Sequence, residues 1–83
     1  MIEKQIKETI QKRLEDAIIH ILNPNGDGIH FEAIVISNQF KGKTLVEQHR
    51  IVMEDLKVLF STSLHALSLK TYTPNQWENN MRS

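Results

Sequence analysis

The spacing of the hydrophobic positions changes several times along this 83-residue chain, and each change predicts a new element. Isoleucine or leucine recurs every four residues among Lys, Glu and Gln over residues 2–16, which predicts an amphipathic helix with one apolar stripe. Short apolar runs then occupy residues 17–22 and 31–37, on either side of the turn-forming stretch NPNGDG at 23–28. This arrangement predicts a β-hairpin with a roughly six-residue tip.

The second half of the chain predicts a long helix followed by a strand. Thr44 and Glu47 are spaced as a capping box after a polar connection at 38–43, so a helix should run over residues 45–60. Residues 64–71 predict the third strand. The inner face of the long helix is expected to hold Leu45, His49, Val52, Met53, Leu56, Leu59 and Phe60.

The last helix has the most sharply marked beginning. Thr73 is the expected N-cap, Pro74 occupies the first helical position, and Gln76 closes a second capping box. Tyr72 and Trp77 are spaced for a hydrophobic staple. These signals predict a helix from residue 74 to about residue 81.

The predicted element order is αββαβα, and it favours one domain over residues 1–83. Two helical stripes and a three-stranded sheet must share a core, so we expect an α+β two-layer sandwich with the helices on one sheet face. The strand after the long helix can run parallel to a hairpin strand, which gives a mixed sheet. The order fits a type II KH-like topology, although a fold alone does not confer RNA binding.

Composition restricts the chemistry. Ten Lys plus Arg balance ten Asp plus Glu, so no global charge attracts nucleic acid or anionic lipid. The absence of cysteine excludes disulfides, thiol catalysis and a self-sufficient iron–sulfur site. No enzyme motif is recognisable, and a binding protein is expected rather than an enzyme. A reducing cytoplasm fits the absence of cysteine and is the expected location. A charged N-terminal region and the lack of a long apolar run predict an unprocessed, soluble chain without a membrane span.

His65, at the start of the third predicted strand, is the residue with most chemical interest. Strand parity places its ring on the same face as Leu67 and Leu69, where a partly buried, hydrogen-bonded histidine is one interpretation. The alternative is a ring that emerges at the rim of the sheet. Neutral imidazole is a good ligand for iron, so the second interpretation makes His65 a candidate metal ligand.

Other candidates for chemistry have ordinary structural explanations beside the functional one. Asp27 lies between two glycines, where turn chemistry is the alternative to metal ligation. His30 should project to the face opposite Phe31, exposed and available as a second possible ligand. His49 is expected to be a satisfied core histidine, and His20 has no spacing that indicates a metal site.

The strongest nucleic-acid candidate is the stretch ahead of the long helix. Lys41, Gly42 and Lys43 precede a helix N-terminus, where backbone donors and two lysines favour a phosphate, and Arg50 lies further along the helix. A KH loop has the pattern Gly-X-X-Gly, whereas only Gly42 is present here. A flexible loop with solvated lysines is the alternative.

Taken together, several short motifs in this order and spacing resemble the BolA family over nearly the whole chain. The motifs are Gly26-Asp27-Gly28-Ile29-His30-Phe31, Phe40-Lys41-Gly42, His49-Arg50 with Val52, His65-Ala66-Leu67, and Thr71-Tyr72-Thr73-Pro74 with Trp77. The Gly-Asp-Gly before His-Phe is most similar to the IbaG-type bacterial branch, whose hairpin tip is short and lacks cysteine.

The resemblance implies a partner of a monothiol glutaredoxin with a Cys-Gly-Phe-Ser site. In such pairs a two-iron, two-sulfur cluster is shared between the glutaredoxin cysteine, glutathione and the BolA-like protein, and the isolated BolA-like chain binds none. The family's recurrent histidine ligand corresponds to His65. The second ligand comes from the hairpin tip as Cys or His, and here that position holds Asp27. An oxygen ligand from Asp27, an imidazole from His30, or no second ligand from this chain remain the alternatives.

The resemblance also implies a second function. Some family members are DNA-binding transcriptional regulators of morphology and stress responses, and weak DNA binding through the lysine stretch is the alternative function here. A homodimer is a further alternative for the assembly.

Overall fold

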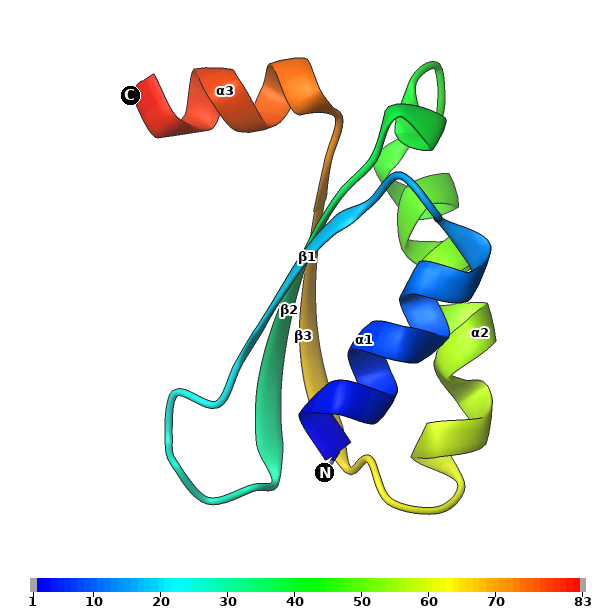
Figure 1. The fold of residues 1–83 in the computed structure, drawn as a ribbon, viewed down its shortest axis with the longest axis vertical. Coiled ribbons are helices and arrows are strands. Elements are labelled where there is room, and N and C mark those ends of the chain that lie inside the picture. Colours follow the sequence, from blue (N-terminus) through cyan, green and yellow to red (C-terminus); the bar gives the residue numbers. More distant parts are fainter. Residues whose placement is uncertain (1, 83) are drawn as a thin grey trace.

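A computed structural model describes residues 2–82 and has the predicted order of helices and strands, around a 3₁₀ turn in the connection (Figure 1). The elements are α1 (Ile2–Arg13), β1 (Ile18–Leu22), β2 (His30–Ile36), the 3₁₀ helix η1 (Asn38–Phe40), α2 (Leu45–Phe60), β3 (Ala66–Tyr72) and α3 (Pro74–Arg82). The α+β class is therefore confirmed, while the KH-like topology stays an interpretation of the same order.

The three strands form one mixed sheet in the order β1-β2-β3. β1 and β2 are antiparallel, whereas β2 and β3 are parallel, with His30 opposite Ala66 and Ile36 opposite Tyr72. Parallel strands begin at the same end of a sheet. Figure 1 accordingly shows the hairpin loop and the loop into β3 together at the lower end, and the connection 38–44 at the upper end.

The two long helices cover one face of the sheet, as predicted (Figure 1). Their apolar stripes and the facing strand residues make the core, which contains Ile6, Ile10, Leu14, Ala17, Ile19, Phe31, Val35, Phe40, Val52, Leu56 and Leu64. Leu45 was expected on the inner face of α2 and is instead 60% exposed. Gln48, also on α2, is buried instead. The Gln48 side-chain amide donates to the carbonyls of Phe40 and Lys43 and accepts from the Thr71 hydroxyl, so its polar atoms are satisfied.

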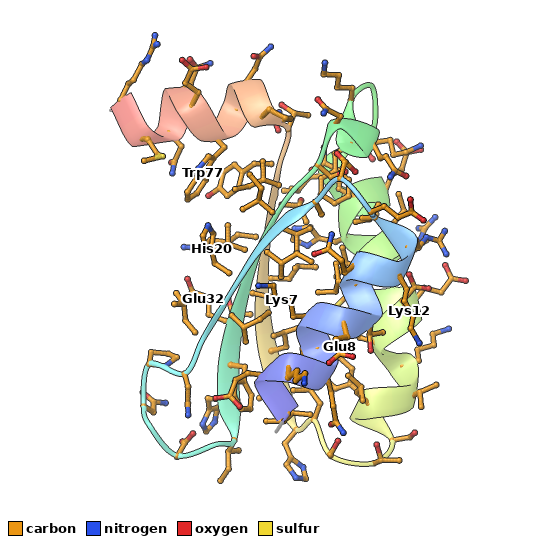
Figure 2. The ribbon with its side chains drawn as sticks, in the orientation of Figure 1. Lys7, Glu8, Lys12, His20, Glu32 and Trp77 are labelled. Carbon is orange, nitrogen blue, oxygen red and sulfur yellow. The ribbon has the colours of Figure 1, made fainter. Side chains whose placement is uncertain are left out.

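The short helix α3 differs from the other two helices in its placement. Tyr72 lies on the sheet face opposite Thr71, whose hydroxyl contacts α2, and its ring packs against Trp77 at a centroid distance of 5.2 Å. Trp77 also lies 6.2 Å from the ring of His20 on β1. Figure 2 shows this pair on the side of the sheet away from α1, so α3 does not share the face covered by the two long helices.

Two element boundaries differ from the prediction by two residues or more. α1 ends at Arg13 rather than at residue 16, because the Gln11 side-chain amide donates to the carbonyls of Leu14, Glu15 and Ala17 and closes the turn into β1. β3 begins at Ala66 rather than at residue 64, because the preceding residues fold back on the end of α2.

Both predicted capping boxes are present. Thr44 and Glu47 exchange side-chain and backbone hydrogen bonds at the start of α2. Thr73 and Gln76 do the same at the start of α3. Local sequence signals therefore set both helix beginnings.

Within residues 2–82, no helix combines the length and the apolar character that crossing a bilayer requires.

Candidate functional site

The hairpin loop at the lower end of the sheet has a defined backbone. Its first turn is closed by the Gly26 N–H, which donates to the Asn23 carbonyl at 3.0 Å. Gly26 and Gly28 have φ values of +65° and +70°, in the left-handed region that favours glycine. The loop residue between them, Asp27, is thereby held with its carboxylate turned toward the start of β2.

Asp27 takes part in three hydrogen bonds within this loop. Its Oδ1 accepts from the N–H groups of Ile29 at 2.9 Å and His30 at 3.1 Å, and its Oδ2 lies 2.9 Å from Nδ1 of His30. The hydrogen bond with the His30 ring, followed by those from the two N–H groups, holds the pKa of Asp27 well below its ordinary value. The turn chemistry that was one interpretation of Asp27 is therefore present.

His30 begins β2 and projects away from the core, as predicted. Its side chain is 57% exposed, whereas the following Phe31 is buried. Because an ionised carboxylate only accepts hydrogen bonds, the proton between the two side chains belongs to Nδ1 of His30. The bond to Asp27 thus fixes the ring orientation and, in the neutral ring, the tautomer.

His65 lies directly before β3 and is exposed. The preceding Leu64 is 1% exposed and anchors the chain in the core. The Leu59 carbonyl at the end of α2 accepts from the N–H groups of Thr62, Ser63 and Leu64 at 3.1, 2.8 and 2.7 Å. The chain is therefore tied down immediately before His65, whose ring emerges at the rim rather than packing inside.

The parallel pairing of β2 and β3 brings these candidates to one end of the sheet. His30 is the register partner of Ala66, the residue that follows His65. A depression of about 320 Å³ beside them is lined by Pro24, His30, Phe31, Glu32, Ala66, Leu67 and Ser68. Across residues 2–82, His, Asp and Glu side chains nowhere gather in threes around a potential metal position. The described part of the chain thus offers a few exposed donors, and these do not form a group of three.

The predicted nucleic-acid residues lie at the opposite end. Lys41, Gly42 and Lys43 are exposed ahead of α2, and Gly42 has a φ of +76°. The helix N-terminus behind them is occupied by the chain's own Glu47, whose carboxylate accepts from the Thr44 N–H. That hydrogen bond holds the pKa of Glu47 below its ordinary value. A phosphate would therefore meet an internal anion at this helix end.

Arg50 lies one turn further along α2. It is exposed and, with four neighbours, lines a groove of about 560 Å³ formed by Arg50, Met53, Glu54, Lys57 and Phe60. The groove does not include Lys41 or Lys43, so the four predicted nucleic-acid residues are not brought into one pocket.

Asp16 is an organising residue that the sequence did not reveal. Its carboxylate accepts from the Ser37 hydroxyl at 2.8 Å, the Asn38 N–H at 2.8 Å and the Gln39 side-chain amide at 3.1 Å. Burial raises the pKa of Asp16, but these hydrogen bonds outweigh it and hold the pKa below its ordinary value. Only the tertiary contact between the turn after α1 and the connection after β2 identifies this role.

The remaining histidines were interpreted with mixed success. His49 was expected to be a satisfied core histidine, but it is only partly buried, and its Nε2 is enclosed without a hydrogen-bond partner among the described residues. His20 lies on β1 with its ring near Trp77.

The fold and its exposed histidine rim define a small α+β protein of one sheet and two layers with an added terminal helix. The profile of the BolA-like protein family matches residues 3–76. The chain therefore belongs to the BolA family, as the sequence motifs suggested.

Individual relatives agree with this assignment. A BolA-like protein of Dictyostelium discoideum is 37% identical over 95% of this chain and 76% of its own length. The Escherichia coli DNA-binding transcriptional regulator BolA is 29% identical over 94% of this chain and 81% of its own length.

Solved structures show the same fold. A BolA homologue from Coxiella burnetii superposes with a TM-score of 0.75 at 39% identity, covering 90% of this chain and 94% of its own. The BolA domain of SufE1 from Arabidopsis thaliana gives a TM-score of 0.74 at 29% identity, covering 87% of this chain and 91% of its own.

Proposed function

We propose that this protein is a cytoplasmic partner of a monothiol glutaredoxin, with which it shares a two-iron, two-sulfur cluster for assembly, transfer or iron regulation. The observation that carries the proposal is His65, an exposed imidazole fixed at the rim of the sheet by the buried Leu64. Membership of the BolA family supports it, because the family resemblance assigns cluster ligation to this histidine. The protein acts here as a binding partner and not as an enzyme.

The donor set of this chain fits that role. An imidazole nitrogen is a suitable ligand for cluster iron, while sulfur ligands must come from elsewhere because the sequence contains no cysteine. The cluster supplies an electron-accepting and transferable iron–sulfur unit when it is bound. The residues of this chain offer the imidazole, hold it at the surface, and provide the docking surface around the depression beside β2 and β3.

The test uses the full chain mixed with a cluster-loaded Cys-Gly-Phe-Ser glutaredoxin and glutathione. Wild-type protein should change the visible circular dichroism of the cluster, and His65→Ala should abolish that change. His20→Ala is the matched control, because His20 is also an exposed histidine but lies on β1, away from the start of β3. Identical spectra for wild type, His65→Ala and glutaredoxin alone would contradict the proposal.

DNA binding is the second candidate function. It is favoured by the name of the Escherichia coli relative and by the exposed Lys41 and Lys43. The double variant Lys41→Ala plus Lys43→Ala should weaken binding and lower the slope of log affinity against log salt by about two.

A matched control removes two exposed lysines from α1, Lys7 and Lys12, which lie along the helix in Figure 2. Equal losses for both double variants would indicate non-specific charge attraction and count against DNA binding by the connection before α2.

A further inference from the structure

The face of the sheet turned away from α1 and α2, here called the open face, carries apolar side chains that are exposed to solvent. Strand alternation and register place Ile18, His20 and Leu22 of β1 on this face, beside Ile34 and Glu32 of β2. Ile18 is 57% exposed and Leu22 is 45% exposed. Neighbouring exposed apolar residues mark an interaction surface more often than single scattered ones do.

The helix α3 borders the upper end of the open face. Trp77 and Met81 are four residues apart, so they lie on the same side of α3. Trp77 packs against the rings of Tyr72 and His20, whereas Met81 is 69% exposed. Figure 1 shows the reason, because α3 leaves the sheet at a steep angle instead of lying flat on it. The apolar side of α3 therefore extends beyond its own sheet.

The charges on this surface are balanced. Glu32 pairs with Lys70 on the open face, and Glu78 pairs with Arg82 on α3. The whole chain likewise has ten basic and ten acidic residues. The surface thus lacks the excess of positive charge that attracts nucleic acid or anionic lipid, and two copies of the chain do not repel each other through their net charge. This balance favours a second copy of the chain over those two kinds of partner.

The shape of the surface also suits a second copy. A two-fold axis between two open faces, parallel to the sheets and perpendicular to the strands, places the upper end of one chain against the lower end of the other. The nine residues of α3 span roughly 13 Å, enough to cross the gap of about 10 Å between two packed sheets. Figure 2 shows Trp77, His20 and Glu32 in that order from the upper to the lower part of the open side.

We infer that the open face and α3 form a homodimer interface in which each α3 covers the lower part of the other sheet. Met81 then meets Leu22 of the second copy, and Arg82 lies within reach of its Glu32, since Leu22 and Glu32 are register partners. The inference is independent of the proposed glutaredoxin partnership. His65 has the strand parity of Leu67, which packs against the core, so the interface does not use it.

Sedimentation velocity tests the inference on the full chain at concentrations from micromolar to millimolar, where the wild type should show a monomer–dimer equilibrium. Leu22→Glu and Met81→Lys each place a charge in the apolar contact and should each raise the dimer dissociation constant by about tenfold or more. Both side chains are exposed in the monomer, so the far-ultraviolet circular dichroism should not change. Val58→Glu is the matched control and should leave the dissociation constant unchanged, because Val58 is a 72% exposed apolar residue on α2.

Mixing the two variants tests which residues meet. In a mixed dimer the introduced lysine of one chain faces the introduced glutamate of the other, while the second contact keeps its original Met81 and Leu22. The mixture should therefore associate more tightly than either variant alone. A mixture that does not do so would overturn the proposed arrangement. A wild type that stays monomeric at millimolar concentration, or a dimer that Val58→Glu weakens as much as the other two variants, would overturn the interface itself.

Discussion

The two ends of the sheet differ in how their polar groups are hydrogen-bonded. At the upper end, the connection between β2 and α2 is tied inward by Asp16, by Gln48 and by the Thr44–Glu47 capping box. At the lower end, Asp27 organises the hairpin loop but leaves one nitrogen of His30 outward, and His65 stands exposed beside it. The upper end is thus fastened by hydrogen bonds within the chain, whereas the lower end leaves the histidine side chains exposed, as the proposed recognition role requires.

The comparison shows that a pattern of polar residues in the sequence does not reveal which polar groups the fold uses internally. The upper connection contains the more obvious pattern, two lysines before a helix, yet its strongest local anion site is filled by Glu47. The lower end contains fewer charges, but His30 and His65 are both exposed there. The two ends therefore differ in that the helix N-terminus at the upper end is already capped by the chain itself.

The largest difference in stability should appear between variants of Phe40 and variants of His65. Phe40 is 0% exposed at the upper end, and Phe40→Ala should lower the free energy of unfolding by about 3–5 kcal/mol through lost burial and cavity formation. His65→Ala should change it by less than about 0.5 kcal/mol. Urea unfolding measures both values. A large loss of stability for His65→Ala would remove the distinction between a structural end and a recognition end.

Asp16→Asn should have an intermediate effect. The variant weakens charge-assisted hydrogen bonds, and we expect the free energy of unfolding to fall by about 1.5 kcal/mol at neutral pH. This loss is smaller than for a buried carboxylate because Asp16 is exposed to solvent. The folded pKa of Asp16 is lowered, so its contribution is complete above the unfolded pKa of about 3.9 and disappears as the pH falls through the folded value.

Unfolding titrations at neutral and strongly acidic pH measure this difference between the wild type and Asp16→Asn. The difference in the free energy of unfolding between the wild type and Asp16→Asn should become smaller at acidic pH. Glu15→Gln is the neighbouring control and should show little change at either pH. A gap that stays constant with pH would mean that the ionised Asp16 carboxylate is not the stabilising species.

A pair of glycine variants gives the smallest effects and the sharpest local comparison. Gly28 and Gly42 have φ values of +70° and +76°, and in both cases an added Cβ meets no atom within 4 Å. Gly28→Ala and Gly42→Ala should therefore each cost about 1 kcal/mol of backbone strain. Only Gly28→Ala should perturb the NMR signals of the His30 ring, and equal perturbation by both variants would contradict a locally ordered lower loop.

Most of the fold was predictable because its signals are local. The four-residue apolar spacing, the turn-forming hairpin tip and the two capping boxes each act over a few residues. The end of α1 and the placement of α3 were not predictable in the same way. The first depends on three carbonyls reached by Gln11, and the second on a contact between Trp77 and a strand far away in the sequence.

The candidate residues of the site were chosen from the sequence, but their arrangement could not be predicted from it. Asp27, His30 and His65 were all identified from sequence, but strand parity left the His65 ring either inside or at the rim. The buried Leu64 and the hydrogen bonds to the Leu59 carbonyl decide that question. The bond between Asp27 and His30 depends on a loop with two left-handed glycines, a geometry that residue spacing alone does not specify.

The contact of α3 with the exposed sheet face has a practical consequence for experiments on this chain. Trp77 is its single tryptophan and is flanked by the rings of His20 and Tyr72. Intrinsic fluorescence will therefore report detachment of the terminal helix, whereas circular dichroism in the far ultraviolet will report melting of the main body. A fluorescence midpoint below the circular dichroism midpoint would show that the terminal helix detaches before the rest of the molecule unfolds.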